Sequence, residues 1–135
     1  MNLRKTKTAT ATELQKNNKS IIVLMTRWHS IFRCKSRLSN EIGALKAAKI
    51  QERLTKHTIN VAKEVEKEGL ADIKVAIDGI GIKAAKRWAV KNKIKKIVPQ
   101  GPGNLGTKMK RQFLKTYANK TTSHQIPKSI LLIGT

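Results

Sequence analysis

The chain has 135 residues, of which 39% are apolar, and a formal net charge of +21 at pH 7. This length suits one domain or part of one, and the apolar content argues against wholesale disorder. No apolar run approaches the roughly 18 residues of a membrane span, and the N-terminus lacks the apolar segment of a secretory signal. The single cysteine, Cys34, excludes an internal disulfide framework. We therefore expect a cytoplasmic protein with no membrane partner.

The large positive charge raises nucleic acid as a partner on electrostatic grounds. Most of the 29 cations are Lys, and they are spread along the whole chain. Arg is the better group for planar contacts with phosphates and bases. Aromatic residues, on which bases stack, make up only 4% of the chain. Non-enzymatic binding of RNA or another polyanion is thus an alternative that the composition does not favour.

The order of predicted elements indicates an α/β fold. Residues 1–19 are polar and read as a flexible basic arm, and residues 20–135 read as one α/β domain. Strands alternating with helices imply parallel pairing and crossover connections. We expect a three-layer architecture with a mostly parallel sheet of about four strands. The strands are predicted at 20–26, 73–77, 94–98 and 129–134, and the helices at 41–68, 82–92 and 105–117.

The longest predicted helix runs from about Glu41 to Glu68 and follows a polar, basic loop over 27–39. Asn40 is its expected N-cap and Gly69 its expected stop. One apolar stripe at helical spacing is expected to face the core. Its members are Ile50, Leu54, Thr58, Val61, Ala62 and Val65.

Cations follow the first predicted strand at Arg27, Arg33, Lys35 and Arg37. Ligands of open parallel sheets bind beyond the carboxyl ends of the strands. Spaced cations there could neutralise a diphosphate or triphosphate through charge-assisted hydrogen bonds. A solvated basic loop explains the same pattern equally well.

A literal GxGxxG, formed by Gly101, Gly103 and Gly106, lies between a strand and a helix. A dinucleotide site is disfavoured, because Pro102 removes an amide donor and no carboxylate follows to hold a ribose. A glycine-permitted tight turn with Asn104 as helix cap would be sufficient locally. A loop that contacts a sugar or phosphate stays open as the alternative.

The acidic residues, the cysteine and the histidines of the chain do not form a pattern that is typical of a catalytic site or a metal site. Asp78 ends the second predicted strand, where an Asp-Gly turn with Gly79 is the preferred interpretation. Cys34 and His29 lack an evident orienting partner for nucleophilic catalysis. The histidines and the cysteine do not have zinc-ligand spacing, so no metal ligand is assigned.

Three segments in order resemble the bacterial glycosyltransferases of GT-A-like fold that are associated with radical-SAM/selenodomain proteins or with arsenosugar biosynthesis. The first matches the family's Thr-Arg-aromatic and Lys-x-Lys-Thr-Arg-Leu motifs, here Thr26-Arg27-Trp28 and Arg33 to Leu38. The second matches Gln-Gly-x-Gly-Asp-Leu-Gly-x-x-Met, here Gln100 to Met109. The third matches apolar-Ile-Gly-Thr, here Leu132 to Thr135.

The resemblance implies the N-terminal, nucleotide-binding part of a GT-A-like enzyme that transfers a glycosyl group from a nucleoside diphosphate sugar to an unidentified acceptor. It implies donor-phosphate contacts from Thr26, Arg27, Lys35 and Arg37. The implied second loop consists of Gln100, Gly101, Gly103, Asn104 and Gly106, and the implied strand-end site of Gly134 and Thr135.

Departures from the family bear on activity. The family's Pro-x-Pro-Gly turn is His29-Ser30-Ile31-Phe32 here, Asn104 replaces an Asp, and the Asp expected after Thr135 is absent. A divalent metal, Mg or Mn, is expected only in a full-length form, because no carboxylate follows Asp78 to hold it. The short chain is expected to be a truncated or inactive form, and its uncovered apolar surface would allow self-association. The enzymatic alternative is a nucleotidyltransferase of the phospholactate guanylyltransferase type, which shares the Lys-Ser/Thr-Arg-Leu loop.

Overall fold

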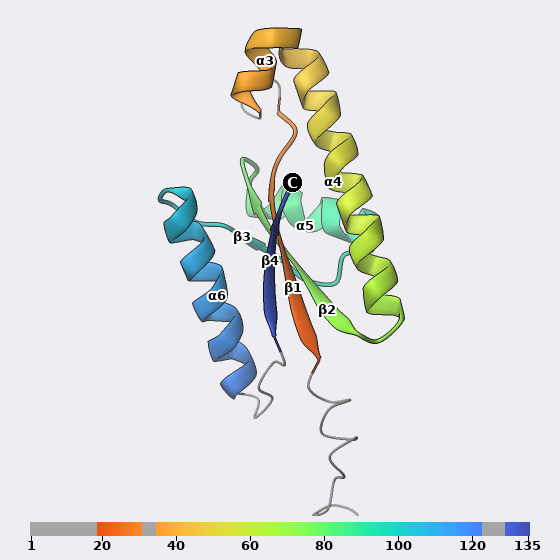
Figure 1. Ribbon diagram of the computed structural model, residues 1–135, viewed down its shortest axis with the longest axis vertical. Helices are drawn as coiled ribbons and strands as arrows, with labels where there is room; N and C mark the ends of the chain where they lie inside the picture. Colours follow the sequence, from red (N-terminus) through yellow and green to blue (C-terminus); the bar gives the residue numbers. More distant parts are fainter. Residues whose placement is uncertain (1–18, 31–34, 123–128) are drawn as a thin grey trace, which may run out of the picture.

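The computed structural model describes residues 19–30, 35–122 and 129–135 (Figure 1). Four strands form one sheet in the order β3-β2-β1-β4, and every pairing between neighbours is parallel. The predicted arm lies outside the described residues except for Lys19, as do Arg33 and Cys34. The predicted four-stranded parallel α/β architecture is confirmed. The strands are β1 (Ser20–Arg27), β2 (Ala71–Asp78), β3 (Ile97–Pro99) and β4 (Ile130–Gly134).

The order in which the strands are added to the sheet reverses at β1. The chain adds β2 and then β3 on one side of β1, and it then returns to place β4 on the other side. Ligand sites of open α/β sheets lie at such a switch point, beyond the carboxyl ends of the strands. The topology therefore directs attention to the ends of β1 and β4, near Thr26 and Thr135.

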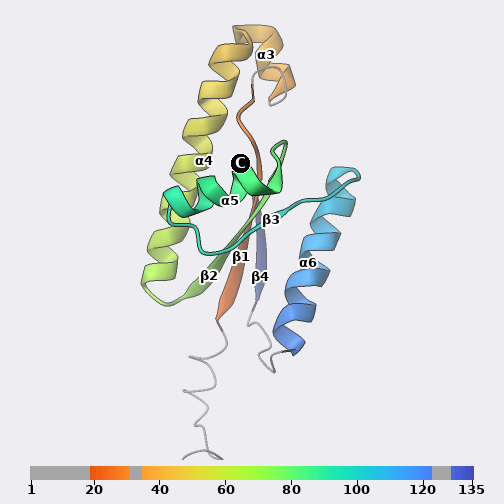
Figure 2. The same ribbon diagram turned by 180° about the vertical axis from the view of Figure 1, so that it is seen from behind.

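Helices cover both faces of the sheet, so the sheet forms the middle of three layers (Figures 1 and 2). Alternate side chains of a strand point to opposite faces. Ile22 and Leu24 of β1 pack with Ile59 of α4 (Ala44–Lys67) and Ala89 of α5 (Ile82–Lys91). The opposite face of β1 carries a second apolar cluster that includes Val23, and α6 (Leu105–Thr122) reaches that face through a contact between Thr116 and Lys74.

The predicted 41–68 helix is wrong at its start, because two helices occupy this part of the chain. α3 (Ser36–Ile42) ends at Gly43, whose φ of 94° is incompatible with a continuous helix, and α4 follows directly. Asn40 lies inside α3 and is not an N-cap. The predicted stop at Gly69 is confirmed: its φ is 79°, and it and Leu70 donate to the last carbonyls of α4.

The core-facing side of α4 also differs from the predicted stripe. Leu54 and Val61 are 42% and 49% exposed, whereas Ala62 is buried as expected. Polar residues occupy part of the buried side because they bond to one another and to the strand ends, as described below. The buried residues of α4 are Ala47, Ala48, Gln51, Thr55, Ile59 and Ala62.

All four strands differ from their predicted limits at one or both ends. β2 starts at Ala71, earlier than predicted, and β3 starts at Ile97 in place of Ile94. Ile94 still belongs to the core, although it lies in the connection before β3. Within the described ranges, no helix is both long and apolar enough to cross a membrane.

Candidate functional site

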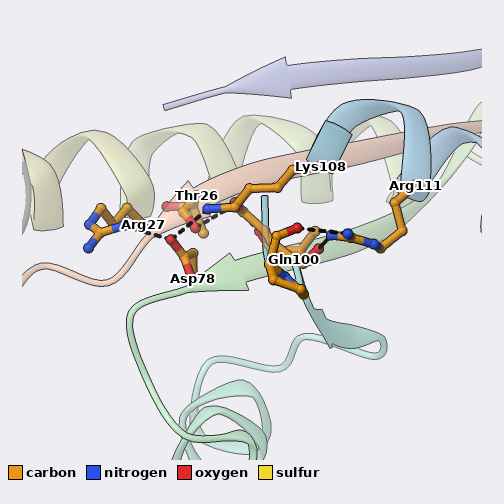
Figure 3. Close-up of polar contacts among 8 residues, drawn as sticks. Thr26, Arg27, Asp78, Gln100, Lys108 and Arg111 are labelled. Atoms are coloured by element: carbon orange, nitrogen blue, oxygen red, sulfur yellow. Dashed lines mark hydrogen bonds and ion pairs between the residues drawn. The ribbon is translucent and has the colours of Figure 1, made fainter. Parts of the chain in front are cut away.

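The carboxyl edge of the sheet gathers polar side chains from several elements (Figure 3). Thr26 and Arg27 end β1, and Asp78 ends β2. Gln100 follows β3, and Lys108 comes from the start of α6. Parallel strands bring their carboxyl ends to one edge, so residues far apart in the chain become neighbours there.

Asp78 is the centre of a three-residue charge cluster. Nη1 of Arg27 lies 2.6 Å from Oδ2 of Asp78, and Nζ of Lys108 lies 3.1 Å from the same oxygen. Arg27 and Asp78 are register partners on β1 and β2. The Lys108 side chain is 18% exposed, so its ammonium group is held at the edge and not spread into solvent. The cluster carries one net positive charge.

Opposing effects act on the pKa of Asp78. Partial burial raises it, whereas the hydrogen bond from Lys108, the charges of Lys108 and Arg27, and the Gly79 backbone N–H lower it. The net effect is a lowered pKa, so Asp78 is ionised at neutral pH. The expected Asp-Gly turn is also present, since Gly79 has a φ of 87°.

A second network lies at the switch point, between the end of β1 and the residue after β4. Thr135 Oγ1 donates to Thr26 Oγ1 at 2.9 Å, and Thr26 Oγ1 lies 3.0 Å from Thr55 Oγ1. The side-chain amide of Gln51 lies 3.1 to 3.4 Å from four acceptors, namely the three hydroxyl oxygens and the Arg27 carbonyl. An amide has two protons, so these acceptors share them. The network fixes α4 against both strand ends.

Sequence reasoning missed Gln51 and Thr55. Both are at least 96% buried, and they are four residues apart on one face of α4. A pattern search that counts only apolar residues skips such positions. The sequence did contain a signal for these two residues: they lie between Ala48 and Ile59 at helical spacing, on the side of the helix that carries small and apolar residues.

Gln100 connects the second loop to the sheet. Its side chain is buried, and its amide donates to the carbonyls of Thr26 at 2.9 Å and Ala76 at 3.0 Å. The backbone carbonyl of Gln100 accepts a hydrogen bond of 2.7 Å from Nη1 of Arg111. Gln100 therefore positions the loop, and its amide protons are used inside the protein.

The glycine loop closes on Arg111 of α6. Gly101 has a φ of 79°, and a Cβ placed there would lie 2.6 Å from Nη1 of Arg111. Nη2 of Arg111 donates to the Pro102 carbonyl at 2.7 Å. Gly103 has a φ of 112°, with Thr107 against it. The positive φ angles and the two Arg111 hydrogen bonds describe a tight turn that is closed by a guanidinium group.

The start of α6 is capped as predicted. Oδ1 of Asn104 accepts a hydrogen bond of 2.9 Å from the backbone N–H of Thr107, which is the N-cap arrangement. Gly106 lies in the first turn of α6, where an added Cβ would meet Asn104 Oδ1 at 3.6 Å, an ordinary contact distance. The cap fixes the direction of α6 and so the positions of Lys108 and Arg111.

Lys35 and Arg37 are placed differently from Arg27. Lys35 precedes α3 with a φ of 46°, and Arg37 is exposed in the first turn of α3. Figure 1 shows α3 beyond the carboxyl end of β1, next to the start of α4. The structure thus joins Arg27 to Asp78 and Lys108, and it leaves the other two cations on a separate element above them. Gly134 ends β4 and is exposed.

Aromatic side chains lie beside the charge cluster. The Trp28 ring is 4.1 Å from the His29 ring and 5.6 Å, edge to face, from the Trp88 ring of α5. The Trp28 backbone N–H donates to the Asp78 carbonyl at 2.7 Å. Sequence reasoning did not pair Trp28 with Trp88, because α5 and β1 meet only in the folded chain.

The residues at this edge do not fit a divalent metal. In the part of the chain that the structure describes, no group of three His, Cys, Asp or Glu side chains could hold an ion. Asp78 is the carboxylate at the strand ends, and two cations already bind it. Hard divalent cations require oxygen ligands and are repelled by adjacent ammonium and guanidinium groups.

Comparisons with known proteins support the fold and leave the family open. No family model matches the chain, and no curated protein matches it. A similar solved structure is that of a "putative nucleotide-diphospho-sugar transferase" from Desulfovibrio desulfuricans G20. The TM-score is 0.59 and the identity 18%, over 85% of this chain and 46% of that chain. The chain thus spans about half of that protein, and it has the α/β fold seen there.

Proposed function

We propose that the carboxyl edge of the sheet binds the diphosphate of a nucleoside diphosphate sugar. The observation that carries this proposal is the convergence of Arg27 and Lys108 on one oxygen of Asp78, beside the switch point of the sheet. The fold of the similar transferase supports it. The chain would then be the nucleotide-binding part of a glycosyltransferase-like protein.

The charge cluster suits a diphosphate for a physical reason. Asp78 orients both cations before the ligand arrives, so little side-chain entropy is lost on binding. An ammonium group has three N–H donors and a guanidinium five, which is more than one carboxylate oxygen accepts. Phosphate oxygens can therefore bind to Arg27 and Lys108 while both cations keep Asp78.

The same groups would assist glycosyl transfer. Negative charge develops on the leaving diphosphate as the glycosidic bond breaks, and fixed cations stabilise that charge. The hydrogen bond between Thr26 and Thr135 holds the end of β1 against the residue after β4. Because the described residues at this edge offer no fitting set of metal ligands, the phosphate contacts in this proposal come from protein cations. The acceptor and the sugar are not assigned.

Binding of nucleotide sugars by the purified chain tests the proposal. Titrations with uridine, guanosine, adenosine and thymidine diphosphate sugars would follow Trp28 and Trp88 fluorescence or heat. We expect saturable binding of a donor from this panel, weakened at least tenfold in Lys108→Ala and in Arg27→Ala, about 1.5–3 kcal/mol for a lost charge-assisted bond. Lys110→Ala, an exposed lysine on the same helix, is the matched control and should bind as the unmodified chain does.

Other outcomes separate the alternatives. Equal affinity in Lys108→Ala and Lys110→Ala would remove the charge cluster from the site. Saturation by a nucleoside triphosphate but not by a diphosphate sugar would favour a nucleotidyltransferase. Binding that falls steeply with salt, without preference among polyanions, would favour the RNA or polyanion alternative. Arg37→Ala tests α3: an unchanged dissociation constant would exclude Arg37 from the site.

A further inference from the structure

Lys74 is a buried lysine on the face of the sheet that α6 covers. It is 3% exposed, and its Nζ donates to Oγ1 of Thr116 at 3.1 Å. Among the described residues, no carboxylate forms an ion pair with it. Lysine is almost never fully buried without a charged partner, so this ammonium group requires an explanation.

A cavity of about 190 Å³ adjoins Lys74 at the amino end of the strands. It is large enough for several water molecules or one small ion. Its polar lining comes from α4, β2, α6 and the segment before β3. The polar residues are Lys74, Lys95, Lys96, Thr116, Glu66 and Asp72.

Positive charge exceeds negative charge around this cavity. Glu66 is already engaged, because Oε2 accepts from the Ile73 backbone N–H at 3.2 Å and Oε1 lies 4.0 Å from Nζ of Lys95. Asp72 is the other lining carboxylate. Burial, together with the charges of Lys96 and Lys115, lowers the pKa of Lys74 to about 8. The group is still mostly charged at pH 7, and an anion in the cavity would offset its lost hydration.

We propose that this cavity binds a phosphate-sized oxyanion, held by Lys74 and Thr116 at its base and by Lys96 at its rim. The Thr116 hydroxyl accepts from Lys74 and keeps its own O–H to donate, and the ammonium group keeps two further donors. Inorganic phosphate and the phosphate group of a phosphomonoester share the chemistry that these groups recognise.

This second site is separate from the carboxyl edge. Asp72 and Asp78 lie at opposite ends of β2, six residues apart, which corresponds to about 20 Å along a strand. One helix links the two, since α6 carries Lys108 near the carboxyl edge and Thr116 near the amino edge. The anion would bind whether or not the carboxyl edge binds a nucleotide sugar.

Calorimetric titration of the chain with inorganic phosphate, at pH 7 in 150 mM chloride, tests this proposal. We expect one saturable site whose affinity falls at least tenfold in Lys74→Met. Lys91→Met, at an exposed lysine of α5, should stay within twofold of the unmodified chain. A phosphate affinity that falls in Lys74→Met but not in Lys91→Met would assign the anion to this cavity. Equal affinity in Lys74→Met, or no saturable site, would overturn the proposal.

A second measurement tests the proposal even if the Lys74→Met variant does not fold. The pKa of Lys74 in the unmodified chain is followed through its Nζ resonance, with and without saturating phosphate. We expect phosphate to raise this pKa, because a bound anion favours the charged amine. A pKa unchanged by phosphate would overturn the proposal independently of any variant. Glycerol phosphate in place of inorganic phosphate then shows whether the cavity admits a phosphomonoester or only the free ion.

Discussion

Arg27 and Asp78 occupy matched positions at the carboxyl ends of β1 and β2, and their ion pair joins Nη1 to Oδ2 at 2.6 Å. Lys108 approaches the same oxygen from α6. One carboxylate oxygen therefore connects two strands and a helix that are far apart in the sequence. Its loss affects both the local fold and the orientation of the two cations.

Asp78→Asn should reduce the free energy of unfolding at pH 7 by about 0.5–1 kcal/mol, the range for partly exposed ion pairs. The folded-state pKa of Asp78 is lowered, so its stabilising contribution is present above the unfolded value of about 3.9. The contribution is lost as pH falls through the folded value. Urea unfolding at pH 7, 5 and 3 should show that the free energies of unfolding of the variant and the unmodified chain converge at the lowest pH.

Glu64→Gln, at an exposed position of α4, is the control for loss of one carboxylate from a chain of high positive charge. It should change stability less than Asp78→Asn at pH 7. A difference between Asp78→Asn and the unmodified chain that stays constant from pH 7 to pH 3 would show that charge is not the cause.

Local sequence pattern was sufficient for much of the fold. Ser20–Thr26 reads as a strand because its β-branched, apolar run suits burial on both faces, and five of its apolar residues are buried. Gly69 and Asn104 were predictable because each residue type suits a helix end: Gly69 takes a φ of 79°, and the Asn104 side chain accepts from the Thr107 N–H. The strand and helix order then left few arrangements other than a parallel sheet.

What the sequence did not reveal depends on contacts between distant segments. Arg111 fills the space beside Gly101, and Gln51 bonds to Thr26 and Thr135, and neither relation has a local signal. The cations after β1 looked like one group, yet Arg27 ends β1 and Arg37 lies in the first turn of α3. Charge spacing along a loop is a weak guide when the loop itself contains a helix.

Gly101→Ala should destabilise the chain by about 1–3 kcal/mol, because it combines a φ of 79° with a contact of 2.6 Å to Nη1 of Arg111. Gly81→Ala is the matched control, since its φ is −66° and nothing lies within 4 Å of the added Cβ. Thermal unfolding of both variants checks this expectation. If the two lose the same stability, the close approach of Arg111 is not a constraint.

Gln51→Leu should destabilise the chain by about 1–3 kcal/mol, because the buried hydroxyl groups of Thr26 and Thr55 and the Arg27 carbonyl would lose a shared donor. Asn60→Leu, at an exposed position of the same helix, controls for the gain of an apolar side chain. Chemical denaturation measures both. A Gln51→Leu variant as stable as the Asn60→Leu variant would mean that the strand ends do not need the amide.

Lys74→Met should raise the free energy of unfolding at pH 7 in phosphate-free buffer by about 1–2 kcal/mol, because it removes a buried charge without an anionic partner. The pKa of Lys74 is about 8 in the folded chain, against a reference value of 10.5. Between these values the unfolded chain binds more protons, so this lysine penalises folding fully below pH 8 and progressively less as pH rises toward 10.5. The advantage of the variant should therefore shrink as pH rises from 7 to 9.5, whereas Lys91→Met should differ from the unmodified chain by less than about 0.5 kcal/mol throughout. A Lys74→Met chain that is less stable by the same amount at every pH would show that the bond to Thr116 outweighs the cost of burying the ammonium group.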